Sequence, residues 1–110
     1  SDAVQQSRQL NRQAQEAFAG GDPVNAVRLL KQAVETAPLY ERNYNDLGVI
    51  LWQLGEQERA YTHFERALRL HPGYQEAKDN LLQAAEILGK RALAEAFLKQ
   101  PQNQLEEEKR

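Results

Sequence analysis

Apolar residues recur along this chain at helical spacing, in segments that glycine and proline interrupt. In the central segment, Leu47, Leu51 and Leu54 follow one another at intervals of three or four residues as far as Gly55, which is the spacing of one face of an α-helix. The same periodicity resumes beyond Gly55, so the glycine marks a turn between two helices. Across the chain, the pattern and its turn signals predict six helices, near residues 3–19, 23–36, 40–54, 57–70, 74–88 and 91–100.

The predicted helices come in pairs that repeat along the chain. Pro38 and Pro72 are 34 residues apart, and each interrupts helical sequence, where a proline costs roughly 3 kcal/mol. The same interval pairs Tyr40 with Tyr74. Further matched pairs are Gly21 with Gly55, Ala26 with Ala60, Leu30 with Phe64 and Ala33 with Ala67. The prolines therefore separate repeats, which we place near residues 7–40, 41–74 and 75–100.

Repeated helix pairs predict an all-α fold. A single pair cannot cover its own apolar face, so successive pairs stack on one continuous core and form an alpha-alpha superhelix, here a right-handed solenoid of helix-turn-helix repeats. Small residues such as Ala14 and Gly48 leave room for bulkier neighbours on adjoining helices. We therefore expect residues 1–100 to form a single domain, and residues 101–110 to form a polar tail that is either disordered or folded back as a cap.

The second repeat resembles the tetratricopeptide repeat (TPR) family, whose period is also 34 residues. Its residues stand where the family signature has an aromatic residue, Leu, Gly, a large apolar residue, Ala, Phe, Ala and Pro. In that order they are Tyr44, Leu47, Gly48, Leu51, Ala60, Phe64, Ala67 and Pro72. The first and third repeats depart from the signature, with Leu10 and Lys78 at the aromatic position. The resemblance implies three tandem repeats that act as a protein-interaction module.

In a solenoid of this kind, the first helix of each repeat lines a concave face, which usually carries binding. Leu47 and Leu51 would face the partner helix, leaving a stripe of other side chains on the concave side. The candidate groove residues are Arg8, Asn11, Gln15, Arg42, Asn45, Val49, Trp52, Gln53, Glu76, Asp79 and Gln83. Arginines stand at one end and Glu76 at the other, around a partly exposed Trp52, whose alternative place is the junction between repeats. We expect an extended peptide or a partner helix as the ligand.

One mode of binding known within the family grips the C-terminal carboxylate of heat-shock chaperones with a set of Lys, Asn and Arg residues. The positions that would match here are Asn11, Gln15, Asp46, Glu76 and Asn80. They do not match that pattern, and two of them are acidic. The sequence therefore predicts that this chain has no such carboxylate clamp.

The composition fits one small domain and argues against two classes of partner. The chain has 110 residues, 41% hydrophobic and 27% charged, with a mean hydropathy of -0.77. Its formal charge of -2 and pI of about 5.7 argue against nucleic acid binding, which usually needs a basic stripe. The longest apolar run, Val49 to Trp52, is far shorter than the ~20 residues of a membrane span, so membrane insertion is not expected.

The chain has no cysteine, which suits any redox compartment. A cytoplasmic location is the default, and a periplasmic one stays open.

The sequence predicts no catalytic residue, metal site or cofactor site. His63 and His71 are eight residues apart, a poor spacing for one metal site, and both suit structural or solvated roles. The only serines are Ser1 and Ser7, near a chain end. Because these residues do not assemble a nucleophile, a base and an oxyanion site, we expect a protein that is not an enzyme.

The last repeat raises a separate hypothesis. Leu93, Phe97 and Leu98 make an apolar stripe that no well-patterned helix follows, although terminal repeats usually need a polar outer face. Leu105 and the acidic tail, another subunit, or the rest of a longer protein would have to cover this stripe. We predict self-association, as a homodimer through the last repeat.

Two functional classes follow from these patterns. The first is a non-catalytic adaptor or scaffold that binds a peptide or a partner helix in the groove. The second is a structural or self-association module excised from a larger protein, where it docks or dimerises an appended catalytic or envelope-assembly domain.

Overall fold

The computed structural model describes residues 1–100, which form helices and short turns and include no strand. The helices are α1 (Asp2–Ala19), α2 (Pro23–Thr36), α3 (Glu41–Gln53), α4 (Gln57–Leu70), α5 (Gln75–Leu88) and α6 (Arg91–Leu98). All six predicted helices are confirmed, with ends that differ by two residues at most. The predictions for the tail at 101–110, including a fold-back of Leu105, lie outside the described residues.

Local sequence sets where the helices begin and end. The side chain of Asp22 accepts a hydrogen bond from the backbone nitrogen of Asn25 at 3.2 Å, and Pro23 follows as the first residue of α2. The turns inside the three repeats each contain a glycine with a positive φ. These are Gly21 at 83°, Gly55 at 84° and Gly89 at 71°. Because side chains of L residues disfavour this conformation, glycine at these positions specifies where the first helix of each repeat stops.

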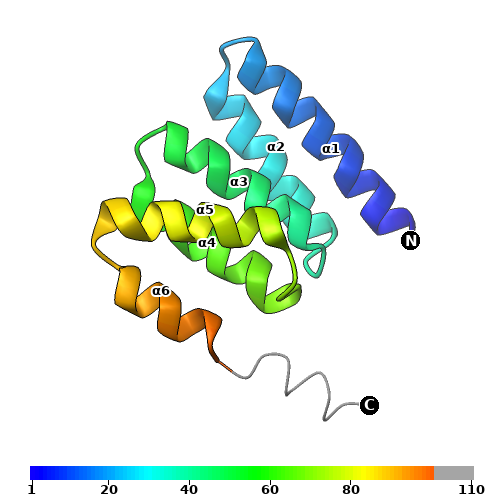
Figure 1. The fold of residues 1–110 in the computed structure, drawn as a ribbon. Coiled ribbons are helices and arrows are strands. Elements are labelled where there is room, and N and C mark those ends of the chain that lie inside the picture. The colour runs from blue at the N-terminus through cyan, green and yellow to red at the C-terminus, as the bar shows by residue number, and fades with distance from the viewer. Residues whose placement is uncertain (101–110) are drawn as a thin grey trace.

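The helices pack as three successive pairs (Figure 1). Within the pairs, α1 contacts α2, α3 contacts α4 and α5 contacts α6, while α2 contacts α3 and α4 contacts α5 between pairs. The first helices also touch in series, α1 with α3 and α3 with α5. The fold is therefore an all-α solenoid, as predicted, in which α1, α3 and α5 form one continuous layer.

The core depends on close approach between the two helices of a pair. Leu47 and Leu51 are almost fully buried, and Ala60 on α4 is fully buried. Gly48 lets the ring of Phe64 lie directly on α3, since a Cβ atom at residue 48 would lie only 2.6 Å from Cε1 of that ring. The small residues of the repeat thus leave space that large side chains of the facing helix fill.

The last helix corrects one expectation. Phe97 shares a face of α6 with the fully buried Ala94 and is itself only 4% exposed, with the guanidinium of Arg69 lying 5.2 Å from its ring centroid. Leu93 lies off that face and is 66% exposed, and Leu98 is partly buried. The prediction that Phe97 offers a surface for self-association is therefore wrong, because its own chain already covers the ring.

Candidate functional site

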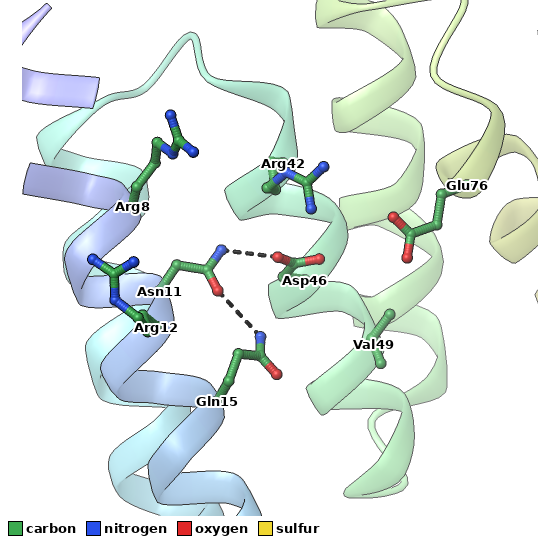
Figure 2. Close-up of a pocket in the computed structure, with 8 residues that line it drawn as sticks. All are labelled: Arg8, Asn11, Arg12, Gln15, Arg42, Asp46, Val49 and Glu76. Carbon is green, nitrogen blue, oxygen red and sulfur yellow. Dashed lines mark hydrogen bonds between the residues drawn. The ribbon is translucent and has the colours of Figure 1, made fainter. Parts of the chain in front are cut away.

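Two hollows lie along the layer formed by α1, α3 and α5. The first, which we call the charged hollow, has a volume of about 420 Å³. It is lined by Arg8, Asn11, Arg12, Gln15, Arg42, Asp46, Val49 and Glu76 (Figure 2). The second, the apolar hollow, has a volume of about 230 Å³ and is lined by Val49, Trp52, Gln53, Phe64, Asn80, Gln83, Ala84 and Ile87. Because Val49 lines both, we treat them as one feature and call it the groove.

The charged hollow separates opposite charges. Arg8 and Arg12 project from α1, Arg42 stands at the start of α3, and Glu76 faces them from the start of α5 (Figure 2). The three arginines are exposed to solvent, so their guanidinium groups are available to carboxylates from outside. The hydroxyl of Tyr74 donates a hydrogen bond to Oε2 of Glu76 at 3.3 Å, which holds that carboxylate at the far side.

A chain of side-chain amides forms the floor beneath these charges. Asn11 Nδ2 donates to Oδ2 of Asp46 at 2.9 Å and to Oδ1 of Asn43 at 3.0 Å, joining α1 to α3. Asn80 Nδ2 donates to Oδ1 of Asn45 at 2.9 Å, joining α5 to α3. Each of these links spans about one repeat, so the amides fix the spacing of the helices that carry the groove.

Asp46 is the acidic group at the centre of this floor. Burial raises the pKa of its carboxyl, while the hydrogen bonds from Asn11 and Asn45 oppose that rise. Burial also raises the pKa of the Tyr74 hydroxyl, and the nearby Asp46 and Glu76 carboxylates raise it further. The groove therefore keeps a neutral phenol and a poorly solvated carboxylate beneath exposed arginines.

Trp52 and Ile87 give the second hollow its apolar character. Trp52 is partly buried, packs against the core and lines this hollow. Ile87 is 65% exposed and Val49 is 36% exposed, so apolar surface stays open to solvent here. Such a site can take an apolar side chain while Gln53 and Gln83 at the same hollow offer amides to its backbone.

Most of the predicted groove residues line one of the two hollows. Those that do are Arg8, Asn11, Gln15, Arg42, Val49, Trp52, Gln53, Glu76 and Gln83. Asn11 contributes little accessible surface, since it is only 7% exposed. Asp79 lines neither hollow; it is exposed and accepts a hydrogen bond from Nε2 of Gln75 at 2.8 Å.

Asn45 needs a correction. We expected it on the exposed inner stripe, but it is fully buried between α3 and α5, where it pairs with Asn80 and Asp46. A side chain with no exposed surface cannot touch a ligand. Asn45 therefore supports the groove without lining it.

Sequence reasoning omitted some lining residues. Arg12 lies four residues after Arg8 and shares its helix face, a spacing that would have identified it. Asp46 and Asn80 also line the groove, and the sequence named them only as positions of the carboxylate clamp. Their hydrogen bonds to other repeats become visible only in the structure. The described part of the chain holds no group of three or more His, Asp or Glu side chains placed to bind a metal. In that same part, no helix combines the length and hydropathy of a membrane span.

Comparison with known families agrees with this architecture. The family model of the tetratricopeptide repeat matches residues 42–74, which include α3 from its second residue, α4, the turn between them and the turn after α4. The central repeat of this chain is a tetratricopeptide repeat. Repeats of this family are generally non-catalytic interaction modules.

Solved TPR structures resemble the whole described fold. A crystal structure of MamA has a TM-score of 0.76 and 22% identity, over 97% of this chain and 61% of that one. The first TPR of Spaghetti (RPAP3), bound to the HSP90 peptide SRMEEVD, has a TM-score of 0.77 and 16% identity, over 89% of this chain and 85% of that one. At these identities the likeness concerns the fold.

A curated relative carries a matching segment within a much longer chain. Protein arginine N-methyltransferase 9 of Xenopus laevis is 32% identical over 75 residues, which is 68% of this chain. The match spans only 9% of the methyltransferase. The two chains therefore share a segment of 75 residues and not a whole architecture.

Proposed function

We propose that this domain is a protein-interaction module that binds an extended peptide or a partner helix in the groove. The observation that carries the proposal is that the charged and apolar hollows adjoin at Val49, which lines both. A ligand of the right pattern can place an acidic side chain at the arginines and an apolar side chain beside Trp52. A basic or amide group of the ligand would then face Glu76.

The rigid floor supports this role. Asn11, Asp46, Asn45 and Asn80 are already hydrogen bonded to one another, so little of the groove has to reorganise on binding. The polar groups left for a ligand are the exposed arginines and Glu76 at the rim and the glutamines of the hollows. Rim charges of this kind govern specificity and association rate more than affinity.

Capture from a lysate of the source cell tests the proposal. The bait is the native chain, and it is compared with Arg42→Glu, Trp52→Ala, which we call the groove variant. The control is Lys31→Glu, Leu54→Ala, a charge-matched change at two residues that do not line the groove, which we call the edge variant. Circular dichroism first establishes that all three are folded. We expect partners that the native chain and the edge variant retain and the groove variant loses; partners retained equally by all three would refute a groove role.

A second candidate is that the repeats serve as a docking module inside a larger protein. The segment shared with the arginine methyltransferase supports it, since there a matching segment belongs to a longer chain named as an enzyme. In that arrangement the groove would bring a partner to an appended domain. Joining this chain to an unrelated enzyme and finding the same groove-dependent partners would favour docking, whereas loss of all partners outside the native context would argue against it.

We also propose self-association through the exposed part of α6. Leu93 is the exposed large apolar residue of this helix, and Leu98 lines a neighbouring hollow with Leu82. Sedimentation of the native chain and of Leu93→Glu should show a concentration-dependent dimer that the substitution abolishes. A native chain that stays monomeric at high concentration would contradict this proposal.

A further inference from the structure

A third hollow lies outside the groove, between α2 and the α3–α4 turn. We call it the edge hollow, and its volume is about 410 Å³. It is lined by Val24, Val27, Arg28, Lys31, Leu51, Leu54, Glu56 and Arg59. No residue lines both this hollow and the groove, so a ligand here would be independent of the one proposed above.

The floor of the edge hollow is apolar and open to solvent. Val24 is 78% exposed and Leu54 is 42% exposed, while Val27 and Leu51 lie deeper and pack against the core. Single exposed apolar residues are ordinary on protein surfaces. Here they converge on one hollow whose size falls within the roughly 300–1,000 Å³ of ligand sites, and an apolar surface ringed by charges is typical of an interaction site.

The rim of the edge hollow is positively charged. Arg28, Lys31 and Arg59 outnumber Glu56, and only Arg59 pairs with that carboxylate, at 3.8 Å on the exposed surface. Within residues 1–100 no acidic side chain forms an ion pair with Arg28 or Lys31. This local excess of positive charge stands on a chain whose formal net charge is -2.

The positive charges of the rim also act on the side chain of His63 on α4. Burial lowers the pKa of its imidazole, and the charges of Arg59 and Lys31 lower it further, although a hydrogen bond to the backbone of Arg59 opposes them. The two cations therefore act on a common region, even though they come from different repeats.

The shape of the hollow favours a helix as its occupant. Val24, Val27, Arg28 and Lys31 follow one another at i, i+3, i+4 and i+7 on α2, a stripe about 10 Å long, or two helical turns. The α3–α4 turn, with Leu54 and Glu56, forms the opposite wall. A helix laid along this trough could bury its apolar face against the floor and meet the cations with its flanks.

We propose that the edge hollow is a second docking site, for an amphipathic helix of a partner protein whose apolar stripe is flanked by acidic residues. The apolar floor takes the stripe, and Arg28, Lys31 and Arg59 pair with the carboxylates. An anionic membrane surface has the same charge but a flat shape, so it could not reach Val27 and Leu51 at the bottom of the hollow.

The test uses a displayed library of amphipathic helices. Apolar residues are fixed at i, i+3, i+4 and i+7, and flanking positions vary among Glu, Lys, Gln and Ser. The bait is the groove variant, which removes the proposed groove ligand from the experiment, so the result stands whether or not the groove binds peptides. The selected helices are then titrated against the edge variant. In a separate titration, vesicles of phosphatidylcholine with phosphatidylserine are the competitor.

We expect enrichment of Glu at the flanking positions and a loss of affinity of about tenfold or more in the edge variant. Enrichment of Lys, no enrichment of either charge, or equal binding to the edge variant would each overturn the proposal. Anionic vesicles that displace the helix and themselves bind the native chain, but not the edge variant, would assign the hollow to a membrane surface instead.

Discussion

At the scale of single residues, a few side chains have a definite structural task that their type explains. Gly48 leaves space for Phe64, and Asn45 joins two repeats by hydrogen bonds. Val49 lines both hollows of the groove. Because each task depends on named contacts, substitutions at these positions have predictable signs.

Gly48→Ala should destabilise the protein. The added methyl group would lie 2.6 Å from Cε1 and 2.9 Å from Cδ1 of Phe64, and 3.2 Å from the backbone oxygen of Ala60. Phe64 is buried and cannot move aside without disturbing its neighbours. We expect a loss of about 1–3 kcal/mol in the free energy of unfolding, which outweighs the better helix propensity of alanine. Urea denaturation measures it.

Gly73→Ala is the matched control. A Cβ atom there would meet only Nε2 of His71, at 3.7 Å, and the backbone of Gly73 has no positive φ. Its free energy of unfolding should stay within ~0.5 kcal/mol of the native value. Equal effects of the two substitutions would contradict the conclusion that Gly48 leaves space for Phe64.

Asp46 should make stability depend on pH in the direction opposite to that of most acidic residues. Burial raises the pKa of its carboxyl above the ordinary value of 3.8, so the folded chain takes up the proton at a higher pH than the unfolded chain does. The stabilisation that this carboxyl provides is therefore fully present at pH values below its pKa in the unfolded chain. It is lost as the pH rises through its pKa in the folded chain. At neutral pH the buried charge is a cost.

Comparison with Asp46→Asn isolates this effect, because other titrating groups cancel in the difference. As pH falls from neutral toward 3.8, the free energy of unfolding of the native chain should rise relative to that of the variant. The measurement is urea denaturation of both proteins across that range. A difference that stays constant with pH, or that falls in the native chain, would show that Asp46 is not penalised by burial.

At the scale of helices and turns, spacing in the sequence predicted which segments form helices and where they end. Periodicity and glycine suffice for this because helix boundaries depend on local chemistry. Burial against another repeat depends on what that repeat presents. For this reason Asn45 and Phe97 were assigned to surfaces, whereas the amide of Asn80 covers the first and the core around Ala94 covers the second. The edge hollow escaped prediction for the same reason, since α2 and the α3–α4 turn form it together.

The packing of α6 can be tested through two of its residues. Phe97→Ala removes a buried ring beneath Arg69 and should cost about 3 kcal/mol or more of unfolding free energy. Leu93→Ala removes an exposed side chain and should cost less than ~0.5 kcal/mol. Thermal and urea denaturation give both values. A larger cost at Leu93 than at Phe97 would mean that α6 packs through the other face.

At the scale of the whole molecule, charge is arranged by surface and not evenly. The charged hollow carries arginines opposite Glu76, and the edge hollow carries an excess of cations over an apolar floor. The formal net charge of -2 does not show this uneven distribution of charge over the surface. The solenoid therefore presents two chemically different surfaces, which suits a module that contacts more than one partner segment.

The groove should not act as a carboxylate clamp. The structure of the first TPR of Spaghetti (RPAP3) is bound to the HSP90 peptide SRMEEVD. Here Asp46 and Glu76 line the charged hollow beside the arginines, so a terminal carboxylate gains no advantage there over an acidic side chain. We therefore expect amidation of the C-terminus of this peptide to leave its Kd unchanged within about twofold. Calorimetric titration of both forms of the peptide checks this. Binding in the micromolar range that amidation abolishes would contradict the prediction.

The central claim is that the groove recognises a peptide segment, and Trp52, the only tryptophan of the chain, reports on it directly. Random peptides are selected on the native chain and then titrated against the native chain and the edge variant while Trp52 fluorescence is recorded; the groove variant, which lacks Trp52, is titrated by calorimetry. We predict that binding shifts the Trp52 emission and weakens about tenfold or more in the groove variant, with the edge variant unchanged. Peptides that bind all three proteins equally and leave Trp52 emission unaltered would contradict the account.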